Sequence, residues 1–124
     1  MFNWIYFMLA TLAGGFGRYF LTGYISQIYG TNFPYGTLIV NLLGCFFIGL
    51  LATLGDEKSL MTPTMRFALM VGFCGAFTTF STFMLETAHL VRDGGTLKAL
   101  ANVLISVIVG FFVFRFGVLF GKIL

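Results

Sequence analysis

Four apolar segments, each long enough to cross a lipid bilayer, take up nearly all of the 124 residues. They cover residues 3–29, 36–54, 63–91 and 96–122, and a spanning helix needs about 20 predominantly apolar residues. Charged residues make up only 9% of the chain, whereas a soluble domain carries about 25%. Because so few charges cannot cover a water-facing surface, we predict an all-α membrane protein with one transmembrane domain over residues 1–124.

The polar connections between these segments predict where the helices begin and end. Thr62 followed by Pro63 is typical of an N-cap and the first helical residue after it. Gly55 is predicted to end the second helix. Thr96 is predicted to cap the fourth helix.

Several classes of function are disfavoured by the same composition. The seven Lys and Arg residues are scattered and form no basic run, which argues against a nucleic-acid partner. Cys45 and Cys74 lie inside apolar segments without metal-type spacing, so we interpret both as small packing residues. No nucleophile–base arrangement is visible, so no enzyme is expected. No cleavage-type boundary follows the first segment, which predicts direct insertion into a bacterial plasma (inner) membrane.

The positive charges are almost evenly divided between the two ends of the predicted bundle. An even number of spans puts both termini on one side, together with Lys58, Arg66 and Lys122. Arg92 and Lys98 lie on the other side. The positive-inside rule needs a clear asymmetry to fix an orientation, so this count is compatible with insertion in both orientations and with an antiparallel homodimer. A fixed orientation set by Lys58 and Arg66 is the alternative.

Small and polar residues recur every three or four positions in three of the segments, which places each set on one helix face. Small stripes usually mark close helix packing in membranes. That interpretation explains the glycines, but it does not explain polar donors that are costly in lipid without partners. The donors are Asn41, Asn102 and Ser106.

The third segment contains the most informative stretch, GFCGAFTTFSTF at residues 72–83. Glycines lower helix propensity, and hydroxyl side chains compete for backbone hydrogen bonds. The stretch therefore predicts either a helix break or an intact helix whose hydroxyls bond to the preceding turn. A break would expose backbone carbonyls, which are good ligands for a hard cation such as sodium.

Phe80 and Phe83 are three residues apart and share a helix face. The edge of a phenylalanine ring carries partial positive charge, so two such edges can line a path for an anion. Ordinary packing is the alternative, because the chain contains 17 phenylalanines.

Two ionisable residues lie within the predicted spans. Arg18 has apolar residues on both sides, so it either reaches the interface or faces a wet vestibule where it would attract anions. Glu86 is compatible with a proton relay, a cation ligand or an ion-pair partner.

Three motifs carry a family resemblance that covers essentially the whole chain: GGFGR at 14–18, GTLIVNLLG at 36–44 and GAFTTFSTF at 75–83. The order of these motifs, the length of the chain and the number of predicted spans resemble those of the Fluc (CrcB-type) fluoride channels of bacteria. The third motif is the most specific of the three.

The resemblance implies an antiparallel dual-topology homodimer with two fluoride pores and a third helix broken in mid-membrane. It implies that Gly75 and Thr78 hold a structural sodium ion through their backbone carbonyls at the dimer interface. Arg18 resembles the vestibule arginine of the family, and Glu86 matches a glutamate whose role is uncertain. By the family pattern, the pore residues are Asn41, Phe80, Ser81, Thr82, Phe83, Asn102 and Ser106.

The chemistry of fluoride agrees with these residue types, because amide and hydroxyl donors can replace the water of a small, strongly hydrated anion. A passive channel is sufficient to lower cytoplasmic fluoride, because a negative cell interior drives anions outward with about 2.3 kcal/mol per charge per 100 mV. A small dual-topology proton-coupled exporter is the first rival, although the first span lacks the central acidic residue it would need. A non-transporting assembly subunit is the second.

Overall fold

The computed structural model describes residues 3–124, and this part of the chain contains helices and no strands. Two of the helical stretches, η1 and η2, have the wider π-helical hydrogen-bond pattern. The elements in chain order are α1 Trp4–Tyr29, α2 Tyr35–Ala52, η1 Thr53–Glu57, α3 Pro63–Arg66, η2 Phe67–Cys74, α4 Gly75–Phe77, α5 Phe80–Arg92 and α6 Thr96–Ile123. The predicted all-α class is confirmed.

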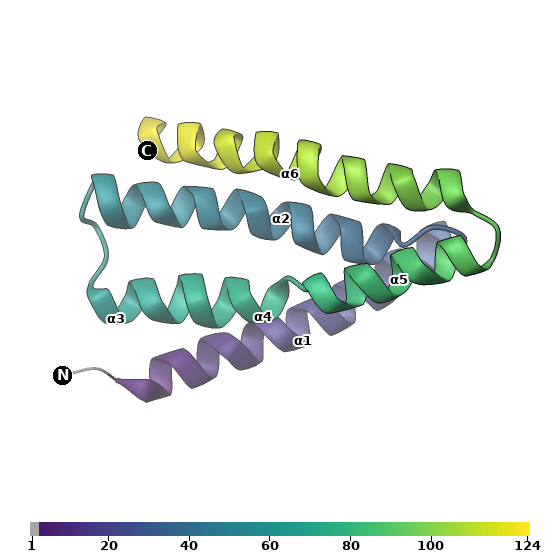
Figure 1. Cartoon of the computed structure of the whole chain (residues 1–124). Helices are drawn as coiled ribbons and strands as arrows, with labels where there is room; N and C mark the ends of the chain where they lie inside the picture. Colours follow the sequence, from purple (N-terminus) through teal and green to yellow (C-terminus); the bar gives the residue numbers. More distant parts are fainter. Residues whose placement is uncertain (1–2) are drawn as a thin grey trace.

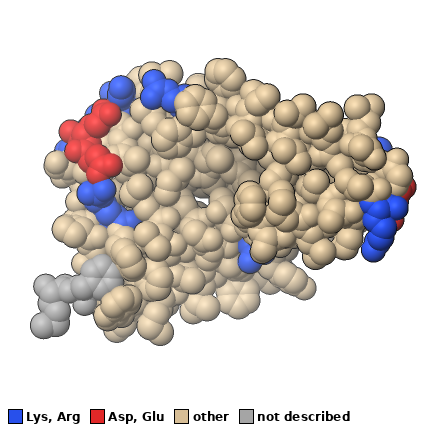
Figure 2. Space-filling model, in the orientation of Figure 1, with Lys and Arg blue, Asp and Glu red and all other residues tan. Residues whose placement is uncertain are grey.

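The helices lie side by side as long rods, with α6 along α2 and with α1 packed obliquely against η2, α4 and α2 (Figure 1). The start of α1, the end of α6 and the connection between η1 and α3 lie at one end of the bundle (Figure 1). Within the described residues 3–124, three stretches are long and apolar enough to cross a bilayer, namely Tyr35–Glu57, Pro63–Arg92 and Thr96–Ile123. On the face shown in Figure 2, charged side chains gather mainly at the two ends, and the broad band between them carries little charge.

The predicted helix ends agree with the structure at one position and differ at two. Thr62 is the N-cap of α3, where its Oγ1 accepts a hydrogen bond from the Met65 amide at 3.2 Å, and Pro63 follows as the first helical residue. The prediction for Thr96 is wrong, because Gly95 occupies the cap position of α6. The prediction for Gly55 is also wrong, because the helix continues through it to the end of η1.

Glycines bring α2 and α6 into close contact along their length. A Cβ atom on Gly49 would overlap the Phe114 carbonyl oxygen, and one on Gly117 would overlap the Phe46 carbonyl oxygen. These approaches leave no room for a side chain on either helix, so the backbones pack directly on one another. The predicted small-residue stripe on the fourth span is thus a packing face.

Most large apolar side chains lie outside this packed centre. Leu97 is 80% exposed and Phe112 is 67% exposed, and similar residues cover the outer faces of α1 and α6. An apolar surface this extensive is not stable in water. It fits a chain whose solvent is the hydrocarbon of a bilayer. Cys74 is buried and Cys45 half-buried, and both are free thiols, in agreement with their interpretation as packing residues.

Candidate functional site

The helical backbone of the third apolar segment is interrupted at two threonines. Thr78 (φ −98°, ψ 159°) and Thr79 (φ −150°, ψ 121°) are extended, and they separate α4 from α5. Local side chains favour this geometry. Thr79 is the N-cap of α5, accepting from the Thr82 amide at 3.2 Å, and Thr78 Oγ1 donates to the Cys74 carbonyl at 2.9 Å. Hydroxyl residues therefore close the end of one helix and start the next.

The backbone groups freed by the interruption find partners from distant parts of the chain. Asn41 on α2 pairs with Thr79 twice: its Nδ2 donates to the Thr79 carbonyl at 3.1 Å, and its Oδ1 accepts from the Thr79 amide at 2.8 Å. One side chain thus replaces two backbone partners, as buried polar groups require. Asn41, which the family pattern predicts to line a pore, therefore braces the interrupted segment in the structure.

Arg18 lies on the other side of the same interruption. Its Nε donates to the Ala76 carbonyl at 3.0 Å, across 58 positions of sequence. In a continuous helix, this carbonyl would accept from the amide four residues later. The sequence suggested an interfacial or a vestibule arginine, and neither alternative anticipated this backbone contact.

The carbonyls of Gly75 and Thr78 lose their helical partners at the interruption. In a continuous helix they would accept from the amides of Thr79 and Thr82, but these amides bond to Asn41 Oδ1 and to Thr79 Oγ1. Gly75 is exposed, and a Cβ atom built on it meets nothing within 4 Å. Both residues line an open groove of about 340 Å³, together with Asn41 and Phe80. The groove thus brings residues from both sides of the interruption together with Asn41 on one open surface, which is mainly apolar.

The two phenylalanines of the motif touch each other but differ in exposure. Their ring centroids lie 5.7 Å apart with an interplanar angle of 66°, an edge-to-face arrangement. Phe80 is 72% exposed at the groove, whereas Phe83 is only 6% exposed. Ser81 is exposed and Thr82 half-buried on the same first turn of α5. The first turn of α5 thus presents one open ring and one enclosed ring.

The polar residues of α6 face the interior of the bundle. Asn102 is 1% exposed, and its Nδ2 donates to Thr87 Oγ1 at 3.0 Å. Thr87 in turn donates to the Phe83 carbonyl at 2.7 Å. Ser106 Oγ is buried and has no hydrogen-bond partner among the described residues. This hydroxyl is therefore a buried donor that could bind a further group.

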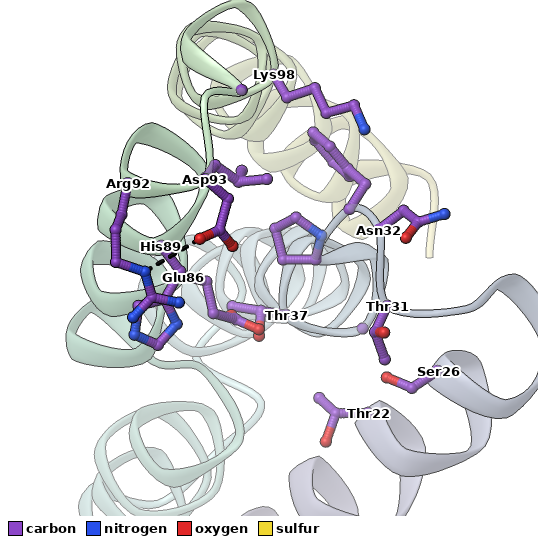
Figure 3. A pocket seen from close by; sticks show the side chains of 15 residues that line it. Thr22, Ser26, Thr31, Asn32, Thr37, Glu86, His89, Arg92, Asp93 and Lys98 are labelled. Atoms are coloured by element: carbon purple, nitrogen blue, oxygen red, sulfur yellow. Dashed lines mark hydrogen bonds and ion pairs between the residues drawn. The ribbon is translucent and has the colours of Figure 1, made fainter.

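A polar cavity of about 440 Å³ lies at the end of the bundle where α5 joins α6. Figure 3 shows Glu86 and Thr37 pointing into it, with Lys98 reaching its rim from α6. One Glu86 oxygen, Oε1, is buried without a partner among residues 3–124. Arg92 also lines the cavity, and its Nε contacts the Asp93 carboxylate at 3.1 Å (Figure 3). Sequence reasoning treated Arg92 and Lys98 only as topology signals and did not anticipate this cavity.

With this geometry described, comparison with known proteins decides the family. The sequence model of one family, described as CrcB-like protein, Camphor Resistance (CrcB), matches residues 5–118. The chain belongs to the CrcB family. It is also 49% identical over 104 residues to a protein of Citrifermentans bemidjiense named "Fluoride-specific ion channel FluC", with 84% of each chain covered.

More distant CrcB relatives match over a greater length. A protein of Solidesulfovibrio magneticus is 42% identical over 94% of this chain and 93% of its own. A protein of Desulforapulum autotrophicum is 38% identical over 98% of each chain. Both carry the name "Fluoride-specific ion channel FluC". The match to the CrcB family includes the interruption, α5 and most of α6. Family membership and the apolar helices together identify the chain as a multi-pass protein of the plasma membrane.

Proposed function

We propose that this chain is a subunit of a fluoride-selective channel that lets fluoride leave the cytoplasm passively. The proposal rests on 49% identity, over most of both chains, to a relative named as a fluoride-specific ion channel. A negative cell interior drives anions outward without a second energy source. The protein is a channel and not an enzyme. Expression in bacteria that lack their own fluoride channel should restore growth in fluoride, and no gain in resistance would contradict the proposal.

The proposed channel is an antiparallel homodimer of four-span subunits. With 26 residues, α1 is about 39 Å long, and a hydrocarbon core is about 30 Å thick. The end with Lys58, Arg66 and Lys122 exceeds the opposite end by a single positive charge, which is too little to fix one orientation. Cysteines placed singly at Asn32 and Lys58 should each be labelled partly from both sides of intact cells. Labelling of each from one side alone would contradict dual topology.

The proposed fluoride path follows the donors and ring edges on α2, α5 and α6. Phe80 is open at the groove, and Ser106 offers a buried hydroxyl without a protein partner among the described residues. Asn102 has used one N–H group on Thr87 and keeps the second. These groups are strong enough to replace water around fluoride, and the ring edges are weak enough to release it. The remaining members of the proposed path are Asn41, Ser81, Thr82 and Phe83.

The proposed cation site consists of the backbone carbonyls of Gly75 and Thr78, which have lost their helical hydrogen-bond partners. No cluster of three or more His, Cys, Asp or Glu side chains that could hold a metal occurs among residues 3–124, so backbone oxygens are the fitting ligands here. The C-terminal end of a half-helix carries partial negative charge and suits a monovalent cation such as sodium. Each copy supplies two oxygens, and a second copy would complete a set of four.

A salt series tests this site without measuring transport. The melting temperature of the purified protein should rise with sodium chloride and stay constant in equimolar choline chloride. Equal melting temperatures in both salts would contradict a bound sodium ion.

Proton-coupled export is the rival that flux measurements separate. Among residues 4–29, α1 contains no acidic residue to exchange protons. Fluoride efflux through a channel should follow the membrane potential and be unchanged by an imposed pH gradient at constant potential. Efflux that tracks the pH gradient instead would favour the exporter.

A further inference from the structure

The geometry points to Arg18 as a positioning residue for the interrupted segment, acting through the N–H group at its Nε and not through its charge. Its Nε donates to the Ala76 carbonyl at 3.0 Å, one residue before the end of α4. The sequence alone suggested a cation that faces a vestibule or the interface. The structure instead engages the guanidinium with the backbone of the element that ends in mid-chain.

The neighbouring residues of α1 make this contact possible. A Cβ atom on Gly14 would overlap the Phe73 carbonyl oxygen, and one on Gly17 would lie 3.5 Å from the Phe77 ring. The α1 backbone therefore lies directly against the last turns before the interruption. With α1 fixed at this distance, the side chain of Arg18 reaches Ala76 across the gap.

The two sides of the interruption are held by different side chains. Asn41 pairs with the amide and carbonyl of Thr79, after the end of α4. Arg18 holds the carbonyl of Ala76, before that end. Ala76 follows Gly75 directly and precedes Thr78 by two residues. Fixing its carbonyl therefore restrains the orientation of the carbonyls of Gly75 and Thr78 on either side.

The consequence for transport rests on the function proposed above. If the carbonyls of Gly75 and Thr78 bind a cation, Arg18 sets their positions from outside the coordination sphere. The binding of that cation then depends on a hydrogen bond, and an uncharged donor in the same place is sufficient. If Arg18 acted instead as a positive charge in a vestibule, any positively charged side chain would serve, and the position of its donor atom would not matter.

Two substitutions of Arg18 separate the donor from the charge. Arg18→Gln places a side-chain nitrogen at the same number of bonds from Cα as Nε and removes the charge. Arg18→Lys keeps the charge and places a methylene group at that position. Arg18→Met removes both and gives the reference for complete loss.

The first measurement is hydrogen exchange of the purified protein, which requires neither fluoride nor sodium. The reporter is the Thr78 amide, which bonds to the Cys74 carbonyl at 3.1 Å at the end of α4. Exchange at Thr78 in Arg18→Lys should be at least about tenfold faster than in the wild type, equivalent to about 1.4 kcal/mol. Exchange in Arg18→Gln should stay close to the wild-type rate.

The second measurement is the melting temperature as a function of sodium concentration. The sodium concentration that gives half of the rise in melting temperature should be lower for Arg18→Gln than for Arg18→Lys. If Arg18→Lys does not assemble and Arg18→Gln does, the yields give the same order. Equal effects of both substitutions, or a larger effect of Arg18→Gln, would overturn the inference. Wild-type protein without fluoride flux would contradict the proposed function alone, because the exchange rates are measured independently of transport.

Discussion

Replacing Asn41 by aspartate should stop fluoride flux while leaving the fold assembled. The substitution keeps the side-chain oxygen that accepts from the Thr79 amide; in the wild type this amide lies 2.8 Å from Asn41 Oδ1. It removes the Nδ2 donor that lies 3.1 Å from the Thr79 carbonyl and puts a carboxylate oxygen in its place. The side chain is half-buried, so water replaces the lost donor only in part.

The expected magnitude follows from the one orphaned carbonyl. A buried acceptor without a partner costs about 1–3 kcal/mol, which lowers the ratio of intact to disrupted interruption by about 5- to 150-fold. Repulsion between the carboxylate and an approaching anion adds to this loss. The weakened interruption and the repulsion of the anion act together, so fluoride efflux through Asn41→Asp should fall to the background rate of protein-free liposomes.

The assay is fluoride efflux from liposomes that contain equal amounts of wild-type or variant protein. Asn32→Asp is the matched control, because Asn32 is exposed in the connection between α1 and α2. Size-exclusion chromatography checks that both variants assemble. Wild-type efflux through Asn41→Asp would refute the assignment of Asn41 to the path and to the bracing of the interruption.

Three further predictions concern the path, the packing and the ends of the bundle. Phe80→Ile should abolish fluoride efflux without changing the melting temperature, because it removes a 72% exposed ring edge at the groove. Gly117→Ala should lower the free energy of unfolding by about 1–3 kcal/mol in denaturant titrations, since its Cβ would overlap a backbone carbonyl of α2. Asp56→Asn should lower it by about 1 kcal/mol at most, because the ion pair of Asp56 with Arg66 is partly exposed.

Each of these predictions has a control or a contrary outcome. Gly15→Ala is the control for the packing variant, because a Cβ there meets nothing within 4 Å. Equal stability losses at Gly15 and Gly117 would contradict close packing as the cause. Undiminished efflux through Phe80→Ile would remove the ring from the path. A loss well above 1 kcal/mol in Asp56→Asn would mean that the ion pair is more shielded than its exposure indicates.

The helical class was predictable because apolar length and scarce charge leave few alternatives for this chain. The position of a weak point in the third segment was also predictable, because glycine and hydroxyl side chains weaken a helix locally, but the residues alone left open whether the helix breaks there. The wider turn η1 was not predictable from local sequence. There, a Cβ on Gly55 would lie 2.9 Å from the Arg66 side chain, a contact between residues of different helices.

The partners of the site residues could not be predicted, because they depend on contacts far apart in sequence. Asn41 meets Thr79 across 38 positions, and Arg18 meets Ala76 across 58. The burial of Asn102 likewise depends on how α6 packs against α5. Periodicity places each of these residues on a helix face, but it does not identify which backbone group of another helix lies opposite.

Fluoride efflux from sealed liposomes tests the central claim most directly. Liposomes with purified protein are loaded with potassium fluoride or potassium chloride, and a potassium ionophore then lets the anion leave along its gradient. Selective passive conduction predicts rapid fluoride efflux while chloride stays inside. Fluoride that remains trapped, or chloride that leaves as fast as fluoride, would contradict the account.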